Sequence, residues 1–425
     1  MNRLYAVESG LSLTGAAADH RLPLQSTRIP AFVEILEHEL AAAGGKSSHD
    51  ESSDPVKKFA HAVAGDLLDK NHLGRSAVCI GEGQPPEAHA AVHRINALLG
   101  NVGKDKPISY TQVPDPRRPS NVAAIRELVD EMQAGNVGAL LILGGNPVYD
   151  APVDLDFGGA LEKVETSLHL STYRDETSRQ CMWHLPRAHF LESWGDGRAY
   201  DGTYSVVQPM IAPLRNGRSA IELLSYILAG IGEDGGKVTE PRKLVQQTFK
   251  QQIAGSSKAN WQQVLRDGLA AGSKWPVESV SKPAPAKQAV KAALPGDDQL
   301  EVVFRRDASV YDGRFANNSW LQELPDPITK MTWGNAALLS PATAEKLGVK
   351  NETISVLKVG ERTVRIPVYV LPGQAAGSIS LPLGYGRTSA GSVGGNSLYV
   401  EPVGVDVYPL RTTDAMHVAT GVSLE

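Results

Sequence analysis

Short apolar runs alternate with amphipathic helical patterns between residues 76 and 172, and this alternation limits the fold more than any other feature of the chain. The apolar runs cover residues 76–83, 107–113, 140–143 and 166–172, and the helical patterns cover 85–100, 120–135 and 156–164. Strands separated by single helices are typical of βαβ units, whose strands run parallel. The alternation therefore predicts an α/β fold with a mainly parallel, doubly wound sheet and flanking helices.

Further helical patterns lie on both sides of this region, over residues 30–43, 56–71, 218–232, 241–254 and 260–272. The polar stretch 44–55 connects the first two. Residues 281–298 are rich in Ala, Pro and Lys, which is typical of a linker. We expect an α/β domain with a helical N-terminal segment over residues 1–280, followed by a linker over 281–298.

The texture of the sequence changes after residue 299. Short β-like runs separated by glycine and proline turns follow one another: "LEVVFRR", "TISVLKVG", "RTVRIPVYVLPG" and "SISLPLGYG". One helix is predicted over 341–349, starting at Ser340 or Pro341 and capped by Gly348. This pattern predicts a C-terminal β-barrel domain over residues 299–425.

The composition excludes several classes of protein. The chain has 425 residues, of which 42% are hydrophobic and 21% charged, as in ordinary globular proteins. A net charge of −5 argues against nucleic-acid binding, which needs a basic face. No run of about eighteen apolar residues is present, so we expect no membrane span. The N-terminal stretch "MNRLYAVESGLSLTG" also lacks the pattern of a secretion signal.

The chain has two cysteines, Cys79 and Cys181. They are too few for an iron–sulfur cluster, which takes about four thiolates, or for a cysteine-rich zinc site. The apolar run "SAVCI" predicts that Cys79 is a core residue. A disulfide between the two cysteines stays open on sequence alone.

Two predicted strands end in glycine-rich turns, Gly81-Glu82-Gly83 and Gly144-Gly145-Asn146-Pro147. Ligands bind beyond the carboxyl ends of strands in an open parallel sheet, and glycine lets backbone N–H groups approach a phosphate. The same glycines suit a tight turn, and neither stretch is a complete phosphate-binding motif. The pattern alone favours a turn over a phosphate contact.

The segment 173–196 concentrates polar side chains, namely Asp175, Glu176, His184, His189, Glu192 and Asp196. The spacing of His184 and His189 does not suit a helical zinc site, and Pro186 interrupts any helix between them. No nucleophile motif accompanies these histidines. We therefore expect a long ordered loop with buried polar groups, no metal ligand and no catalytic residue.

The predicted barrel contains two candidate ligand stretches, "LPLGYGR" over 381–387 and "VYPLRT" over 407–412. Gly384, Gly386 and Arg387 would let the first stretch wrap a flat ring system, with Tyr385 stacked on it and Arg387 or Arg411 on an anionic group. The simpler interpretation, which the pattern favours, is a set of barrel turns with surface arginines.

Three long stretches occur in an order that is more specific than any single motif: "LLILGGNPVYDAPVDLDF", "DETSRQCMWHLPRAHFLESWGDGRAYDGTYSVVQPMIAPL" and "LLSPATAEKLGVKNETISVLKVGERTVRIPVYVLPGQAAGSISLPLGYGR". The order resembles that of the molybdopterin oxidoreductases of the dimethyl-sulfoxide-reductase type, over most of residues 75–420. The resemblance implies that the barrel is of the double-psi type and closes over a pterin dinucleotide. It also implies a set of cofactor-binding positions: Gly144, Gly145, Asn146, Pro147, Asp175, Glu176, Thr177, Gly384, Gly386 and Arg387.

The stretches "MNRLYAVESGLSLTGAAADHRL", "GGNPVYDAP", "WHLPRAHFLESWGD" and "YPLRTTDA" resemble one branch of that family more closely. This branch is the molybdopterin-like iron–sulfur subunit of alternative complex III, a bacterial quinol-oxidising membrane complex. The resemblance implies that the pterin-type domain holds no molybdenum cofactor, and that electrons pass through iron–sulfur clusters in a separate C-terminal domain.

The chain departs from the family pattern in two ways. It lacks the N-terminal part that supplies a metal-ligating Cys or Ser, and it lacks the cysteine-rich cluster domain. Bulky Trp183 and His184 also stand where the family usually has "A-D" before "L-P". We therefore expect a fragment that holds no cofactor, with molybdopterin guanine dinucleotide as the alternative and iron–sulfur clusters only in the missing domain.

These observations support three functional hypotheses. The first is a non-catalytic scaffold in a quinol-oxidising electron-transfer complex, bound to other subunits and peripheral to the bacterial inner membrane on its periplasmic face. The second is the C-terminal half of an active molybdopterin oxidoreductase that binds the pterin dinucleotide. The third is a small-molecule enzyme on the doubly wound sheet, which would depend on Asp175, Glu176 and Asp196.

Overall fold

The computed structural model describes residues 2–42, 53–113, 121–231, 239–255, 257, 259–280, 299–396 and 398–425. The chain divides into two compact units. Unit 1 comprises Met1–Ser109, Pro152–Leu155 and Ser279–Glu425, and unit 2 comprises Tyr110–Ala151 and Asp156–Glu278. This grouping differs from the predicted domain boundaries, which stay a prediction. The predicted linker 281–298 and most of the polar connector 44–55 lie outside the described residues.

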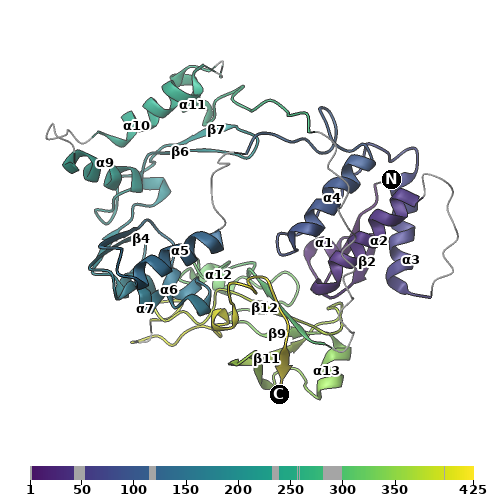
Figure 1. Cartoon of the computed structure of the whole chain (residues 1–425). Helices are drawn as coiled ribbons and strands as arrows, with labels where there is room; N and C mark the ends of the chain where they lie inside the picture. The colour runs from purple at the N-terminus through teal and green to yellow at the C-terminus, as the bar shows by residue number, and fades with distance from the viewer. Residues whose placement is uncertain are drawn as a thin grey trace. The chain divides into compact units, whose positions relative to one another are not determined.

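The N-terminal part of unit 1 is built from two parallel strands and three long helices. The strands are β1 (Tyr5–Glu8) and β2 (His20–Pro23), with the short helix α1 (Leu13–Ala16) between them. The helices are α2 (Ile29–Ala42), α3 (Pro55–Leu68) and α4 (Pro86–Leu98). Their apolar faces form one core, which contains Phe32, Leu36, Ala60 and Ile95. The three predicted helices are confirmed (Figure 1).

The strand predicted over 76–83 is wrong, because residues 76–80 pair with no other strand. Side chains of α4 and of the residues after it bond this backbone instead. Asn96 accepts from the amide of Val78 at 3.0 Å and donates to its carbonyl at 2.8 Å. Cys79 is exposed, so its interpretation as a core residue is also wrong. The run at 107–113 forms only isolated bridges, at Ile108 and Tyr110.

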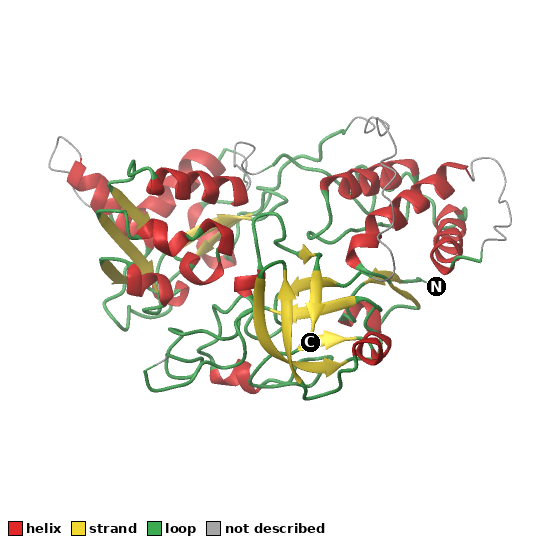
Figure 2. Cartoon of the chain, turned by 60° about the horizontal axis from the view of Figure 1, so that its bottom comes forward, coloured by secondary structure: helices red, strands yellow, loops and turns green. Residues whose placement is uncertain are grey.

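The C-terminal part of unit 1 is a nearly closed seven-stranded sheet in the order β13-β8-β12-β9-β11-β10-β14. The strands are β8 (Glu301–Arg305), β9 (Ala337–Leu339), β10 (Ile354–Val359), β11 (Arg362–Val370), β12 (Ser378–Pro382), β13 (Val418–Ala419) and β14 (Val422–Leu424). Only Thr420 and Gly421 separate the two end strands β13 and β14, so one short segment almost joins the edges of the sheet. Figure 2 shows these strands curving around one another.

The predicted barrel is confirmed in its strands and in its helix. The four β-like runs become β8, β10, β11 and β12. Helix α13 (Pro341–Leu347) begins after Ser340, whose side chain accepts from the amide of Thr343, and ends at Gly348 with φ of 67°. A second short helix, α12 (Ser319–Glu323), precedes β9. Buried Leu and Ile side chains fill the interior of the sheet. The finer double-psi assignment stays a prediction.

A buried carboxylate joins the two parts of unit 1. Glu301 on β8 is 1% exposed. Its carboxylate accepts from the amides of Ser26 at 2.6 Å and Thr27 at 2.9 Å, at the turn that leads into α2. It also accepts from the hydroxyl of Ser378 on β12. A carboxylate that is removed from water must be bonded in this way, so Glu301 fixes the N-terminal part onto the barrel.

Unit 2 contains a three-stranded parallel sheet in the order β3-β4-β5. The strands are β3 (Ala139–Ile142), β4 (Thr166–Ser171) and β5 (Trp183–Pro186). The helices associated with the sheet are α5 (Asn121–Gln133), α6 (Pro147–Asp150), α7 (Phe157–Leu161) and α8 (Glu176–Gln180). The predicted strands at 140–143 and 166–172 are confirmed, as is their parallel pairing.

The sheet differs from the prediction in two respects. It has fewer strands than the alternation indicates, because 76–83 and 107–113 do not join it. Its third strand, β5, lies in the segment interpreted as a loop, where α8 and the strand β6 (Gly195–Arg198) also form. Strand β3 is also less buried than its apolar run predicts, since Ala139 is exposed and Leu140–Ile142 are half-buried. It is an edge strand, and among the described strands it pairs with β4 alone.

The rest of unit 2 is a small helical layer on a hairpin. Strands β6 and β7 (Tyr204–Val207) pair antiparallel. The helices are α9 (Ala220–Ile231), α10 (Pro241–Thr248), which continues as a π-helix over Phe249–Ile253, and α11 (Trp261–Asp267). Tyr204, Phe249 and Val264 belong to their shared core. The three predicted helices of this region are confirmed.

Candidate functional site

The turn after β3 requires glycine. Gly144 and Gly145 have φ of 86° and 79°, in the left-handed region that side chains with a Cβ avoid. Asn146 precedes the first turn of α6, and Pro147 opens it. The sequence "GGNP" therefore sets the direction in which the chain leaves the strand. The described hydrogen bonds include none from the amides of Gly144 and Gly145.

A buried polar network fixes this turn to the start of α8. The amide group of Asn146 donates to the carboxylate of Glu176 at 2.7 Å. Its carbonyl oxygen accepts from the backbone amide of Thr177 at 3.0 Å and from the Thr177 hydroxyl at 2.7 Å. The Thr177 hydroxyl accepts in turn from the amide of Val148 at 3.0 Å. The structure thus brings together the predicted site residues 144–147 and 175–177.

Asp175 has a structural partner of its own. Its carboxylate accepts from the amide of Ser178 at 2.9 Å and so caps α8. The imidazole of His169 on β4 lies 3.4 Å from the same carboxylate and 2.8 Å from the Ser178 hydroxyl. His169 is fully buried, and its Nε2 has no hydrogen-bond partner in the described structure. Sequence reasoning missed His169 and Ser178, because both lie in ordinary strand and helix patterns.

Arg187 is a further residue that the sequence analysis did not select. A Cβ built on Gly144 would lie 2.5 Å from Nη1 of Arg187, so the guanidinium lies directly against the glycine turn. Arg187 is exposed, and the described structure records no hydrogen bond or ion pair from its side chain. Glycine backbone amides beside an unpaired guanidinium are the donor set that binds phosphate. Its position directly after the strand run "WHLP" was the available signal.

The glycines of the predicted ligand loop in unit 1 lie against other backbone segments of that unit. A Cβ on Gly384 would lie 2.6 Å from the backbone nitrogen of Gly313, and one on Gly386 would lie 2.1 Å from that of Asp406. Arg387 is 5% exposed and donates to the carbonyl of Gly313 at 2.6 Å. The interpretation as surface arginines is therefore wrong. These glycines allow chain segments of unit 1 to pack against one another.

Two further residues of this region, Arg411 and Tyr385, are also buried. Arg411 is buried and donates from Nε to the carbonyl of Met416 at 3.0 Å. Tyr385 is buried, and burial, followed by the charge of Asp307, raises its pKa above the usual value. Burial likewise raises the pKa of Asp307. Within unit 1 the ring of Tyr385 is therefore packed rather than presented for stacking.

The three carboxylates on which a small-molecule enzyme would depend each have a different hydrogen-bond partner, so they do not form one cluster. Asp175 caps α8 and Glu176 bonds Asn146, whereas Asp196 accepts from the hydroxyl of Tyr204 at 2.8 Å. Among the described residues no group of three or more His, Cys, Asp or Glu side chains is arranged to hold a metal ion. Cys79 and Cys181 are both free thiols in the structure, so the disulfide between them is not formed.

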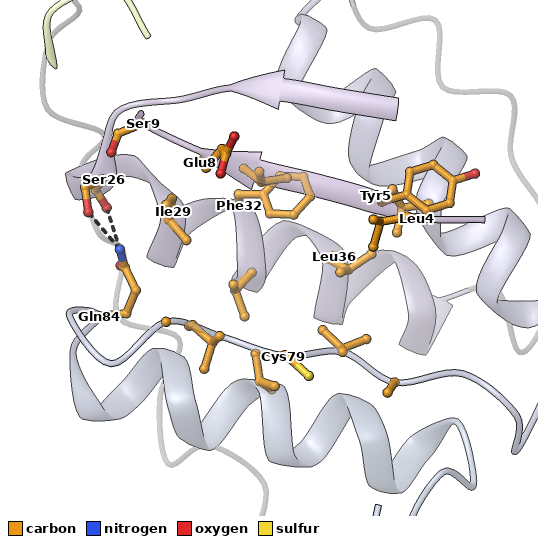
Figure 3. A pocket seen from close by; sticks show the side chains of 18 of the residues that line it. Leu4, Tyr5, Glu8, Ser9, Ser26, Ile29, Phe32, Leu36, Cys79 and Gln84 are labelled. Atoms are coloured by element: carbon orange, nitrogen blue, oxygen red, sulfur yellow. Dashed lines mark hydrogen bonds between the residues drawn. The ribbon is translucent and has the colours of Figure 1, made fainter. Parts of the chain in front are cut away.

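A cavity of about 1040 Å³ lies within unit 1, between β1 and the segment 76–84. Its floor is apolar and comes from α2, α3 and α4, with Phe32, Leu36 and Val63 among the lining residues. Gln84 crosses one end and donates to the Ser26 hydroxyl at 2.9 Å (Figure 3). Sequence reasoning did not predict this cavity.

Comparison with known proteins shows similarity to a curated protein and to a solved structure. No family model matches the chain. The chain is 24% identical, over 89% of its length and 59% of the relative, to the menaquinone reductase molybdopterin-binding-like subunit of Nitratidesulfovibrio vulgaris. Among solved structures it resembles acetylene hydratase from Pelobacter acetylenicus, with a TM-score of 0.65 at 13% identity, over 98% of this chain and 70% of that one.

The chain therefore shares the fold of that solved structure, and its similarity to the menaquinone reductase subunit agrees with the family resemblance predicted from the sequence. The resemblance to the molybdopterin oxidoreductases of the dimethyl-sulfoxide-reductase type is thereby confirmed, whereas the closer resemblance to alternative complex III stays a prediction. The chain spans about three fifths of the length of the curated relative that it matches. No helix among the described residues has the length and apolar character that crossing a membrane requires.

Proposed function

We propose that this chain is a non-catalytic scaffold subunit in a complex that exchanges electrons with quinone. The relative is named as the molybdopterin-binding-like subunit of a menaquinone reductase, which makes it part of a quinone-linked assembly. We further propose that this complex is of the alternative complex III type, which is a quinol-oxidising membrane complex. The chain is then held at the periplasmic face of the bacterial inner membrane by other subunits.

The observation that carries the cofactor-free proposal is the packing around Gly384, Gly386 and Arg387. A pterin dinucleotide needs glycine faces and a guanidinium that are open to it. In unit 1 the backbone of Gly313 and Asp406 occupies those faces, and Arg387 bonds the carbonyl of Gly313. These residues do not fit the group in the described arrangement, so we assign no chemical step to it.

The alternative proposal is the C-terminal half of an active molybdopterin oxidoreductase. The glycine turn of unit 2 favours it, because Gly144 and Gly145 offer unbonded amides beside the unpaired guanidinium of Arg187. That donor set fits a phosphate, which is the charged part of molybdopterin guanine dinucleotide. Gly144–Pro147, Asp175, Glu176 and Thr177 would then hold one end of the cofactor.

Metal and pterin analysis of the native complex tests the two proposals. The complex that contains this chain is purified under anaerobic conditions, and its molybdenum and tungsten are measured by mass spectrometry. Pterin is measured by its fluorescence after oxidation. The scaffold proposal expects far less than one metal ion and one pterin for each copy of this chain, while quinol oxidation persists. One of each for every copy of the chain would contradict it and favour the alternative.

A pair of substitutions addresses the small-molecule hypothesis in the same complex. Asp175→Asn removes the carboxylate that caps α8, and Glu176→Gln removes the one bonded to Asn146, while both keep the side-chain shape. The scaffold proposal expects quinol oxidation to fall only as far as assembly of the complex falls. A loss of turnover in fully assembled complex would instead assign these carboxylates a chemical role.

A further inference from the structure

The cavity of unit 1 lies along an unpaired strand edge. Leu4 and Glu8 accept from the amides of His20 and Leu24, so these residues of β1 face β2. Backbone groups alternate sides along a strand, and Tyr5 and Val7 therefore direct their N–H and C=O groups to the opposite side. Strand β1 pairs with β2 alone among the described strands. The described part of the chain therefore supplies no partner for the donors and acceptors on the outer edge of β1.

A second backbone edge faces the cavity from the other side. The amides of Ser76 and Val78 bond the side chains of Asn101 and Asn96, at 3.3 and 3.0 Å. Backbone groups alternate sides along an extended segment, so Ala77 and Cys79 direct their N–H and C=O groups away from those asparagines. No backbone hydrogen bond of Ala77 or Cys79 is recorded in the described part of the chain. Asn96 and Asn101 hold this segment extended without a neighbouring strand.

The two edges run in the same direction. Figure 3 shows Tyr5 followed by Glu8 and Ser9 on one side of the cavity, and Cys79 followed by Gln84 in the same sense on the other. Beneath both edges lies one apolar floor, in which Tyr5, Val7, Val78 and Ile80 pack on the core of α2, α3 and α4. Lining residues of this floor include Phe32, Leu36, Val63 and Val92.

We propose that this cavity binds an extended, apolar β-strand that runs parallel to β1 and belongs to polypeptide outside this sequence. The strand would pair with Tyr5 and Val7 on one side and with Ala77 and Cys79 on the other. It would complete a parallel sheet in the order β2, β1, added strand, 76–80. Parallel strands lie about 4.8 Å apart, and their alternate side chains would cover the apolar floor.

The length of the relative supports a polypeptide occupant. The menaquinone reductase subunit is matched over only 59% of its length, whereas 89% of this chain is matched. Protein outside the matched part is therefore available in that relative to supply a strand. A small apolar ligand would use the floor of the cavity, but it would leave both rows of backbone donors and acceptors unpaired. This inference is independent of the proposed scaffold function.

Peptide binding to the whole chain tests the proposal. The probes are overlapping fifteen-residue synthetic peptides from the part of the menaquinone reductase subunit that this chain does not match. We expect one peptide with alternating apolar residues to bind. It should slow amide hydrogen exchange at Val7 and Cys79 on the order of tenfold or more, as pairing protects amides, and leave β11 unchanged. If no peptide slows exchange at these two amides, the proposal is wrong.

Proline substitution separates strand pairing from simple occupancy of the cavity. Proline is tolerated on a strand edge whose N–H faces solvent, so Val7→Pro should fold, which the unfolding midpoint of the isolated chain checks. It removes a cavity-facing donor, and we expect peptide affinity to fall about tenfold or more. Cys79→Pro makes the same test on the opposite edge. Val7→Ile keeps the donor and should bind as the unchanged chain does.

A truncated menaquinone analogue serves as the competing probe. If it binds this cavity with equal affinity in the unchanged chain and in Val7→Pro, and no peptide competes with it, the cavity is a small-molecule site and the proposal fails. Peptide binding that Val7→Pro leaves unchanged would also contradict pairing along β1.

Discussion

The two glycine-rich groups of this chain resemble each other in sequence and differ in what lies against them. In unit 1, Gly384 and Gly386 meet the backbone of Gly313 and Asp406, and the nearby Arg387 is buried. In unit 2, Gly145 has nothing within 4 Å of an added Cβ, and the exposed Arg187 guanidinium beside Gly144 has no partner among the residues that the structure describes. A glycine in a sequence therefore indicates either that another group packs closely against the backbone or that the backbone adopts a turn. It does not show whether the neighbour is the protein or a ligand.

Among the substitutions that test this comparison, Gly386→Ala should cause the largest loss of stability. A Cβ there would lie 2.1 Å from the Asp406 nitrogen, and the residue has φ of 70°. Overpacking and left-handed strain together should lower the free energy of unfolding by about 3 kcal/mol or more. Urea unfolding followed by circular dichroism measures the loss.

Gly421→Ala is the matched control for this substitution. Its φ of 69° is nearly the same, but nothing lies within 4 Å of the added Cβ. Only the left-handed strain remains, at about 1 kcal/mol. Equal losses for the two variants would show that Gly386 serves the backbone conformation alone and that its face is open.

The two arginines offer the next largest contrast. Arg387→Met keeps much of the apolar volume but leaves the Gly313 carbonyl without its donor, which should cost about 2 kcal/mol. Arg187 lies on the surface, so Arg187→Met should change the free energy of unfolding by less than about 0.5 kcal/mol. Thermal unfolding of both variants makes the comparison, and a larger loss for Arg187 would reverse the assignment of the two residues.

Thr177→Val tests the polar network of unit 2. Thr177 is fully buried, and its hydroxyl bonds Asn146 and Val148, at 2.7 and 3.0 Å. Loss of both bonds in a buried place should cost about 2 kcal/mol. Thr166→Val on β4 is the control, since no side-chain hydrogen bond of Thr166 is recorded in the described structure. Similar losses at the two threonines would mean that the network adds little.

The smallest expected effect is a pH dependence at His417 in unit 1. Burial lowers the pKa of His417 below its usual value; the charge of Glu82 opposes this shift, and the charges of Arg411 and Arg306 add to it. The unfolded chain therefore binds the proton more tightly, so this contribution to stability is complete above about pH 6.5 and is lost as the pH falls below it.

Because His417 is only half-buried, the loss should be a few tenths of a kcal/mol. Unfolding at pH 5.0 and pH 7.5 measures it, and His417→Gln should remove this part of the pH dependence. A pH dependence unchanged by that substitution would place its source elsewhere.

The sequence predicted the barrel well because its signals are local. Strands β10 and β11 alternate clearly around Gly360, and Ser340 and Gly348 mark both ends of α13. Position within a sheet is not a local property. The run "SAVCI" has strand composition, but it lies beside a cavity where no partner strand is present in the described chain. Periodicity alone cannot reveal that missing neighbour.

The candidate site was predicted in part for similar reasons. The family resemblance located residues 144–147 and 175–177, which the structure brings close together, with Asn146, Glu176 and Thr177 joined in one hydrogen-bond network. His169 and Arg187 were missed because tertiary packing, and not a motif, brings them to that network and that turn. Arg387 was interpreted as a surface residue because an arginine beside turn glycines usually lies in solvent. Its burial depends on the distant residue Gly313.

A density map of the assembled native complex at side-chain resolution tests the central claim most directly. We predict that Arg387 donates to the Gly313 carbonyl, that Asp406 packs on Gly386, and that no pterin density lies beside Gly384–Arg387. Pterin density at that position, with Arg387 turned from Gly313 toward the cofactor, would contradict a cofactor-free scaffold.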